Sequence, residues 1–102
     1  MVKKVYKTKG WVWVYAAENA AWHFVYVDKQ TSLHIKNSIL KKVSFGSVKV
    51  KVKIGQSEFE TSLFPDRKSS CYLLPLKKSV RNAENIYEND EIFFEIEVKN
   101  NR

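Results

Sequence analysis

The segment VKVKVKIGQSEFETSL, residues 48–63, constrains the fold most, because apolar and polar residues alternate along it with a period of two. This period is typical of a β-strand that packs one face on a core and leaves the other in water. Gly55 and Gln56 interrupt the alternation with glycine first, as a two-residue type II′ turn prefers. The sequence therefore predicts a β-hairpin.

The two-residue loop also fixes which residues face each other across this hairpin. We expect Lys53 opposite Glu58 and Lys51 opposite Glu60. Cross-strand pairs of opposite charge stabilise a sheet by about 0.2–1 kcal/mol each. The row of lysines is therefore predicted to be a solvated, locally paired strand face, which is weak evidence for a polyanion site.

A second hairpin is predicted from GWVWVYAAENAAWHFVYV, residues 10–27. A four-residue loop would align Trp13 with Tyr26 and Tyr15 with Phe24. Alternation puts six aromatic residues on one face: Trp11, Trp13, Tyr15, Trp22, Phe24 and Tyr26. The opposite face is aliphatic and carries His23, which we interpret as a half-buried structural histidine with its hydrogen bonds satisfied.

Because both faces of this hairpin are apolar, neither is expected to lie broadly in water. We expect the aromatic residues to line the core or a dimer interface. The alternative is an open platform on which bases or a flat ligand would stack.

The alternation breaks after Asp28, which with Thr31 and Ser32 is a candidate N-cap. Ile35 and Ile39 follow at helical spacing, so we expect a short helix that covers one face or mouth of a barrel. Residues 44–46 are predicted to turn the chain into the 48–63 hairpin.

The segment CYLLPLKKSVRN, residues 71–82, is predicted to change from strand to helix at Pro75, which would occupy the first helical position. Lys77 and Arg81 would then share one flank. Together with Ser62 they are a hypothetical clamp for an anionic ligand.

An internal salt bridge is the alternative for Arg81. Asn89 and Asp90 are expected to form the turn before a last strand at 92–98, because asparagine tolerates the left-handed conformation. Asp90, Glu91 or Glu95 would be the partner of Arg81, and Asp90 and Pro75 are assigned structural roles.

The composition fits one domain over residues 1–102, with 44% hydrophobic residues. Cys71 has no second cysteine to bond with, and with two histidines it gives no zinc ligand set, so we expect no metal and no cofactor. No signal peptide or apolar run of about 20 residues is present, which predicts a cytoplasmic protein without a membrane segment.

Three stretches carry a resemblance: TSLFP at 61–65, YLLPLKKSVR at 72–81 and END-EIFFEIEV at 88–98. With these stretches the chain resembles the domain-of-unknown-function family 1905, small bacterial proteins. The resemblance implies a compact β-barrel with one or two short helices and no established activity. Asn89 stands where the family usually has glycine. A shorter likeness to the swapped-hairpin DNA-binding dimers of the AbrB-like group supports a shape more than a function.

The fold class expected is therefore mostly β, a closed or partly open barrel of about six to seven strands with one or two short helices. We favour a non-enzymatic binding or protein-interaction module, most naturally a homodimer, since no catalytic constellation is recognisable.

Two alternatives to this function are kept open. One is nucleic-acid binding through the basic residues of the N-terminal half, which carries a formal charge of 11 − 2 = +9 over residues 1–53 and includes Lys3, Lys4, Lys7, Lys9, Lys41 and Lys42. The other is binding of a small anionic ligand at the barrel mouth.

Overall fold

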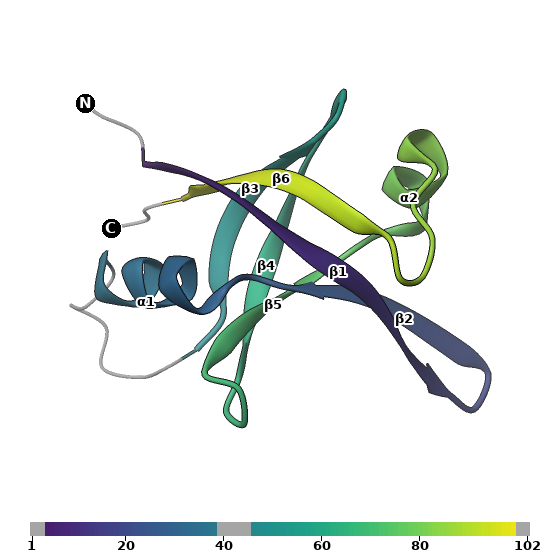
Figure 1. Ribbon diagram of the computed structural model, residues 1–102, viewed down its shortest axis with the longest axis horizontal. Helices are drawn as coiled ribbons and strands as arrows, with labels where there is room; N and C mark the ends of the chain where they lie inside the picture. The colour runs from purple at the N-terminus through teal and green to yellow at the C-terminus, as the bar shows by residue number, and fades with distance from the viewer. Residues whose placement is uncertain (1–3, 39–45, 100–102) are drawn as a thin grey trace.

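The computed structural model describes residues 4–38 and 46–99, which form six antiparallel strands and two helices (Figure 1). The elements are β1 (Val5–Ala17), β2 (Ala20–Tyr26), α1 (Lys29–Ser38), β3 (Val48–Ile54), β4 (Ser57–Asp66), β5 (Cys71–Pro75), α2 (Lys78–Glu84) and β6 (Glu91–Val98). The strands close into a barrel in the order β1-β2-β5-β4-β3-β6. The predicted fold class is confirmed, and the barrel closes within one chain, without a strand from a second copy.

The hairpin of β3 and β4 has the predicted register, with Lys53 opposite Glu58 and Lys51 opposite Glu60. Gly55 adopts a positive φ of 58°, as the first position of the turn requires. The inward side chains of β3, from Val48 to Ile54, are all buried. This strand forms one wall of the hydrophobic core.

The predicted register of the first hairpin was wrong. Trp13 lies opposite Phe24, and the strands stay paired up to Ala17 and Ala20. Asn19 takes a left-handed conformation with φ 69°. A two-residue turn is therefore enough, and the flanking alanines extend the strands. The change is an even number of positions, so each residue keeps its predicted face.

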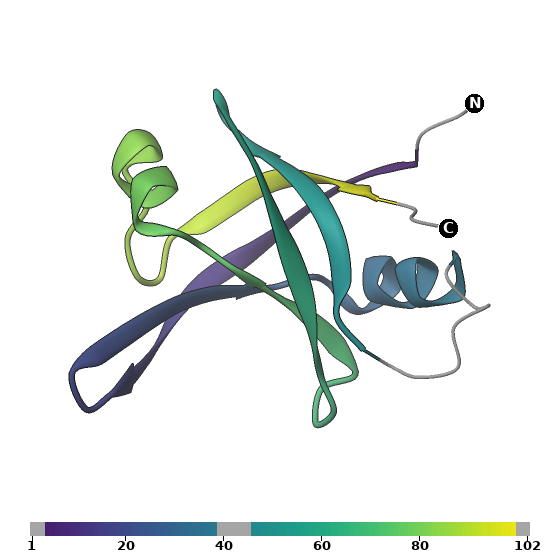
Figure 2. The same cartoon turned by 180° about the vertical axis from the view of Figure 1, so that it is seen from behind.

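Helix α1 lies at one end of the barrel and α2 at the other (Figures 1 and 2). The Asp28 carboxylate caps α1 by accepting the Thr31 N–H at 3.0 Å. Ile35 is fully buried, and the buried Ser32 hydroxyl donates to the Val27 carbonyl and accepts the Tyr72 N–H, each at 3.0 Å. The predicted helix is confirmed, whereas Ile39 and the turn expected at 44–46 lie outside the described residues, apart from Gly46.

Replacing Asp28 by alanine should lower the free energy of unfolding by roughly 1 kcal/mol or more, because an N-cap and a second hydrogen bond are both lost. The second bond comes from the Thr8 hydroxyl. Burial alone would raise the pKa of Asp28, but the hydrogen bonds from Thr31 and Thr8 outweigh it and hold that pKa below its usual value. The stabilisation of the fold by these hydrogen bonds to the Asp28 carboxylate is therefore complete at neutral pH. It is lost as the pH falls through the lowered pKa.

Urea unfolding at pH 7 and at pH 3 measures the effect of Asp28→Ala. Asp28→Asn is the matched control, since asparagine is also a good N-cap. Equal stability of the alanine variant and the wild type at pH 7 would contradict the capping role.

The prediction that Pro75 begins a helix was wrong. Pro75 is the last residue of β5, opposite Phe24 of β2, and α2 begins at Lys78 after an extended Lys77. The Leu76 N–H donates to the His23 carbonyl at 2.9 Å, which continues the strand pairing by one residue. Proline is tolerated at the end of a strand. Because the additional bond keeps Leu76 extended, the helix begins only at Lys78.

Candidate functional site

The aromatic face is the name used here for the outward side chains of β1 and β2: Trp11, Trp13, Tyr15, Trp22, Phe24 and Tyr26. The register places Trp13 opposite Phe24 and Tyr15 opposite Trp22. The Trp13 ring packs against Phe24 and Tyr26, with ring centroids 5.2 and 5.5 Å apart. The six residues thus form one continuous surface across two strands.

The aromatic face lies outside the barrel, so of the two expected locations, the core or a dimer interface, the core was wrong. Trp11, Tyr15 and Trp22 are 63%, 57% and 56% exposed. Val12 and Val25, on the other face of the same strands, are buried. A six-stranded barrel is narrow, and the branched aliphatic side chains of this hairpin fill its interior while the tryptophans face outward.

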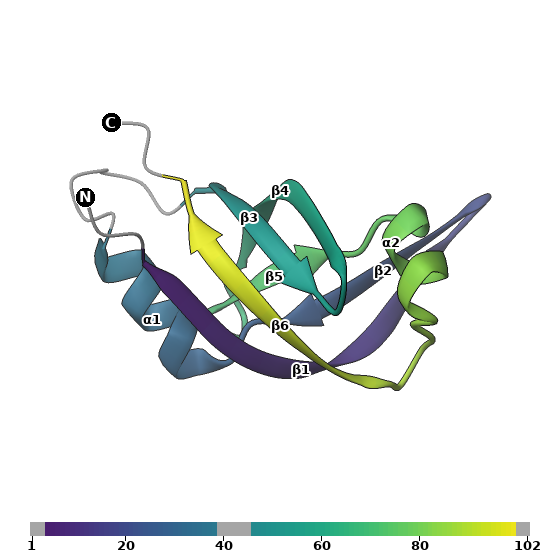
Figure 3. The ribbon, with the colours of Figure 1, turned by 90° about the horizontal axis from the view of Figure 1, so that it is seen from above.

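The end of the β1–β2 hairpin projects beyond the rest of the barrel (Figures 1 and 3). Pairing of β1 with β6 stops at Trp11 opposite Glu91, and pairing of β2 with β5 starts at Phe24 opposite Pro75. Half of the aromatic face therefore lies on a two-stranded ribbon, which pairs with no third strand among residues 4–38 and 46–99.

The apolar surface continues from the aromatic face onto the next two strands. Leu73 of β5 lies beside Tyr26, and Phe64 of β4, which is 45% exposed, lies beside Leu73. At this border the Tyr26 hydroxyl donates to Asp66 Oδ2 at 3.3 Å. Burial, and then the charge of Asp66, raise the pKa of Tyr26, so the phenol stays neutral.

The other outward faces carry alternating charges. Lys53 of β3 lies between Glu58 of β4 and Glu95 of β6, and Lys51 lies between Glu60 and Glu97. The ion pairs of this surface include Lys51 with Glu58 at 3.4 Å and Lys99 with Glu60 at 3.2 Å. The predicted register of this lysine row is confirmed, but the ion pair joins Lys51 diagonally to Glu58 rather than to Glu60. Strand β6 adds acids that the hairpin alone did not predict.

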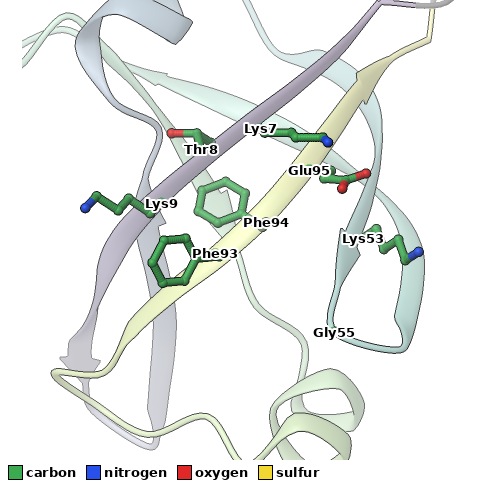
Figure 4. Close-up of a pocket in the computed structure, with 8 residues that line it drawn as sticks. All are labelled: Lys7, Thr8, Lys9, Lys53, Gly55, Phe93, Phe94 and Glu95. Atoms are coloured by element: carbon green, nitrogen blue, oxygen red, sulfur yellow. The ribbon is translucent and has the colours of Figure 1, made fainter.

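A groove of about 590 Å³ opens where β3 and β6 separate (Figure 4). Lys7, Lys9 and Lys53 line it, but Figure 4 shows Lys9 pointing away from the other two. Lys9 instead lies over the exposed Phe93 ring, 5.7 Å from its centroid, and pairs with Glu91 at 3.7 Å. The ammonium groups do not converge, so the groove is a poor phosphate clamp.

A second surface cavity, of about 550 Å³, separates the aliphatic face of the projecting hairpin from α2. His23 and Val14 line it on the hairpin side, and Arg81 and Glu88 line it on the other. Arg81 Nη1 lies 3.5 Å from His23 Nε2, and Arg81 Nε donates to the Leu76 carbonyl at 3.2 Å. This cavity thus brings the Arg81 guanidinium and the His23 imidazole together from distant parts of the chain.

The electrostatic environment of His23 favours the neutral imidazole. Burial, and then the Arg81 guanidinium, lower the pKa of His23, and Glu88 opposes them. His23 is half-buried, as expected, but its Nδ1 is buried without a hydrogen-bond partner in the part of the chain that the structure describes. The prediction that the hydrogen bonds of His23 are satisfied was therefore wrong.

The clamp predicted from Ser62, Lys77 and Arg81 is not assembled. Ser62 lies on the outer face of β4 opposite Lys49, and Lys77 lies over the Phe59 ring at 5.6 Å. Arg81 lines the cavity beside His23, and neither Ser62 nor Lys77 is among the residues that line it. Sequence reasoning identified Arg81 but missed His23, because the contact joins residues 58 positions apart.

The internal salt bridge expected for Arg81 is absent among residues 4–38 and 46–99. Asp90 instead accepts the Tyr87 N–H at 2.8 Å and its carbonyl accepts the Val12 N–H, while Glu91 pairs with Lys9. Asp90 thus holds the turn before β6, where Asn89 has φ 75°.

Within the described ranges, no three side chains of His, Cys, Asp and Glu gather to hold a metal ion. In the same ranges no helix is long and apolar enough to cross a membrane.

These features define a small closed antiparallel β-barrel domain with an exposed aromatic sheet face. The chain belongs to the family described as Domain of unknown function (DUF1905), whose model matches residues 9–96. The resemblance noted from its motifs is thereby confirmed. No curated protein matches the chain.

Proposed function

We propose that this protein is a non-enzymatic interaction module that associates with a second copy of itself through the aromatic face. The observation that carries the proposal is the exposure of three large aromatic side chains, Trp11, Tyr15 and Trp22, on one face of the β1–β2 hairpin. Soluble monomers rarely leave a contiguous apolar surface of this kind in water.

The chemistry of the face favours a second copy as the occupant. Homodimer interfaces are more apolar than transient ones, and charged residues are depleted from their centres. The six side chains of the aromatic face include no charged group, and Lys9, two residues before Trp11 in β1, is already paired with Glu91. A two-fold axis would place the same apolar patch on both sides of the interface.

Nucleic-acid binding has less support from the described surface, and three of the lysines on which that alternative rests, Lys3, Lys41 and Lys42, lie outside the described residues. Residues 4–38 and 46–99 hold fourteen Lys and Arg against eleven Asp and Glu, so their net charge is 14 − 11 = +3, compared with +7 for the whole chain. On β1, next to the aromatic face, Lys7 lies opposite Glu95 of β6 and Lys9 pairs with Glu91. A basic track beside the stacking residues, which single-stranded nucleic acid needs, is therefore missing from this surface.

Sedimentation of the wild type over roughly 1–500 µM, a range that brackets weak and tight dimers, tests the proposal. We expect the mass to rise from 12.0 kDa toward twice that value. Tryptophan quenching by acrylamide should fall over the same range. A monomer with accessible tryptophans at the highest concentration would overturn the proposal. Oligonucleotide binding that weakens linearly in log salt would favour the nucleic-acid alternative.

A further inference from the structure

The cavity between the projecting hairpin and α2 lies on the opposite side of the hairpin from the aromatic face. His23 and Val14, which face each other across β1 and β2, alternate with the aromatic residues and so point the other way. A ligand in this cavity would therefore leave the aromatic face free. The cavity is independent of the proposed self-association.

The contact between Arg81 and His23 leaves one N–H group without an acceptor in either neutral form of the imidazole. If the proton is on Nδ1, a buried donor has no partner among the described residues. If it is on Nε2, two donors face each other across 3.5 Å, at the outer limit of hydrogen bonding. A buried donor without an acceptor is unfavourable, because it loses its bonds to water and gains none in return.

The Arg81 guanidinium is half-buried, and its Nε is held by the Leu76 carbonyl. No carboxylate of the described residues lies within ion-pair distance of it. Arginine is the side chain best suited to bind carboxylate and phosphate oxygens through its remaining N–H groups. With Nε held by Leu76, Nη1 has only the 3.5 Å contact with His23 Nε2, and Nη2 has no partner among the described residues.

We infer that Arg81 and His23 form a binding site for a small oxyanion, whose oxygen accepts hydrogen bonds from the guanidinium and the imidazole. The ligand class is a molecule with a carboxylate or a tetrahedral oxyanion group. The volume of about 550 Å³ accommodates a metabolite larger than the bare anion. Asn82 and Asn85, which also line the cavity, supply amide groups for its neutral part.

The experiment is an NMR titration of the full chain with sodium sulfate and, in parallel, with sodium acetate, at constant ionic strength. We expect saturable shifts of the His23 ring and the Arg81 Nε–H with at least one anion, and the pair of titrations separates tetrahedral from carboxylate preference. Arg81→Gln should weaken this binding at least tenfold. Arg67→Gln, on the exposed β4–β5 turn, makes the same charge change and should alter binding less than twofold.

Glu88→Gln gives a test that does not disturb the Arg81–Leu76 bond. Glu88 lines the same cavity and repels an anion there, so its neutralisation should tighten binding about threefold to fivefold. Glu18→Gln, at the tip of the hairpin, removes the same charge at a distant point and should have no such effect. Non-saturable shifts, or equal shifts in the Arg81→Gln variant, would overturn the inference.

The pH dependence supplies a further readout. The charged or titratable groups around His23 are Arg81 from α2 and Tyr87 and Glu88 from the segment after it, while β1 presents only Val14. An anion between Arg81 and His23 favours the imidazolium and raises the pKa of His23. Sulfate binding should therefore tighten severalfold as the pH falls from 8 to 5.5, and His23→Gln should remove this dependence. A pH-independent affinity in the wild type would exclude His23 from the site.

Discussion

Replacing both Trp11 and Trp22 by serine should weaken self-association at least 100-fold. Both side chains are more than half exposed in the single chain, so a partner can bury most of their surface. Aromatic residues at the centre of an interface typically contribute about 2 kcal/mol or more each when truncated. Two such losses exceed the roughly 2.7 kcal/mol that corresponds to a factor of 100.

The same substitution should leave the folded monomer almost unchanged, within about 0.5 kcal/mol, as is usual for substitutions outside the core. Neither tryptophan is among the buried residues. Sedimentation measures the association, and urea unfolding at low protein concentration measures the monomer. Tyr87→Ser is the matched control, since Tyr87 is 67% exposed but lies outside the aromatic face. Association of the double variant at wild-type strength would show that the interface lies elsewhere.

The β3–β4 hairpin was predictable because local chemistry determines it. Glycine at the first turn position and strict alternation specify one register, and Val52 faces Phe59 accordingly. The first hairpin was less determined, since both of its faces are apolar and its loop can hold two or four residues. Only Asn19, which adopts a left-handed conformation, distinguishes these lengths.

The candidate sites were only partly predictable, because each depends on contacts between distant segments. Alternation grouped the six aromatic residues correctly but did not show which face of the hairpin the barrel would enclose. The cavity beside Arg81 depends on the bond from the Leu76 N–H to the His23 carbonyl, which sets where α2 starts. The sequence of residues 71–82 alone does not indicate that bond. Pro75 was therefore predicted to begin the helix, and the contact between His23 and Arg81 was not predicted.

Gly10→Ala should lower the free energy of unfolding by about 3 kcal/mol, although alanine suits a strand better than glycine does. Gly10 lies in β1 opposite Ile92, just before β1 begins to pair with β2. A Cβ atom there would lie 2.6 Å from Val25 Cγ2 and 2.7 Å from the Tyr26 carbonyl oxygen. The carbonyl is backbone, so relief requires β1 and β2 to separate at the point where the barrel closes.

For a chain of this length, a loss of about 3 kcal/mol corresponds to a fall in Tm on the order of 10–20 °C, which thermal unfolding followed by circular dichroism detects easily. Gly46→Ala is the matched control, because a Cβ atom there meets nothing within 4 Å. It should be neutral or slightly stabilising. If the two variants have the same Tm, the close approach of β1 to β2 is not a requirement of the fold. If only Gly10→Ala is destabilised, the strands that carry the aromatic face are also the strands whose contact closes the barrel.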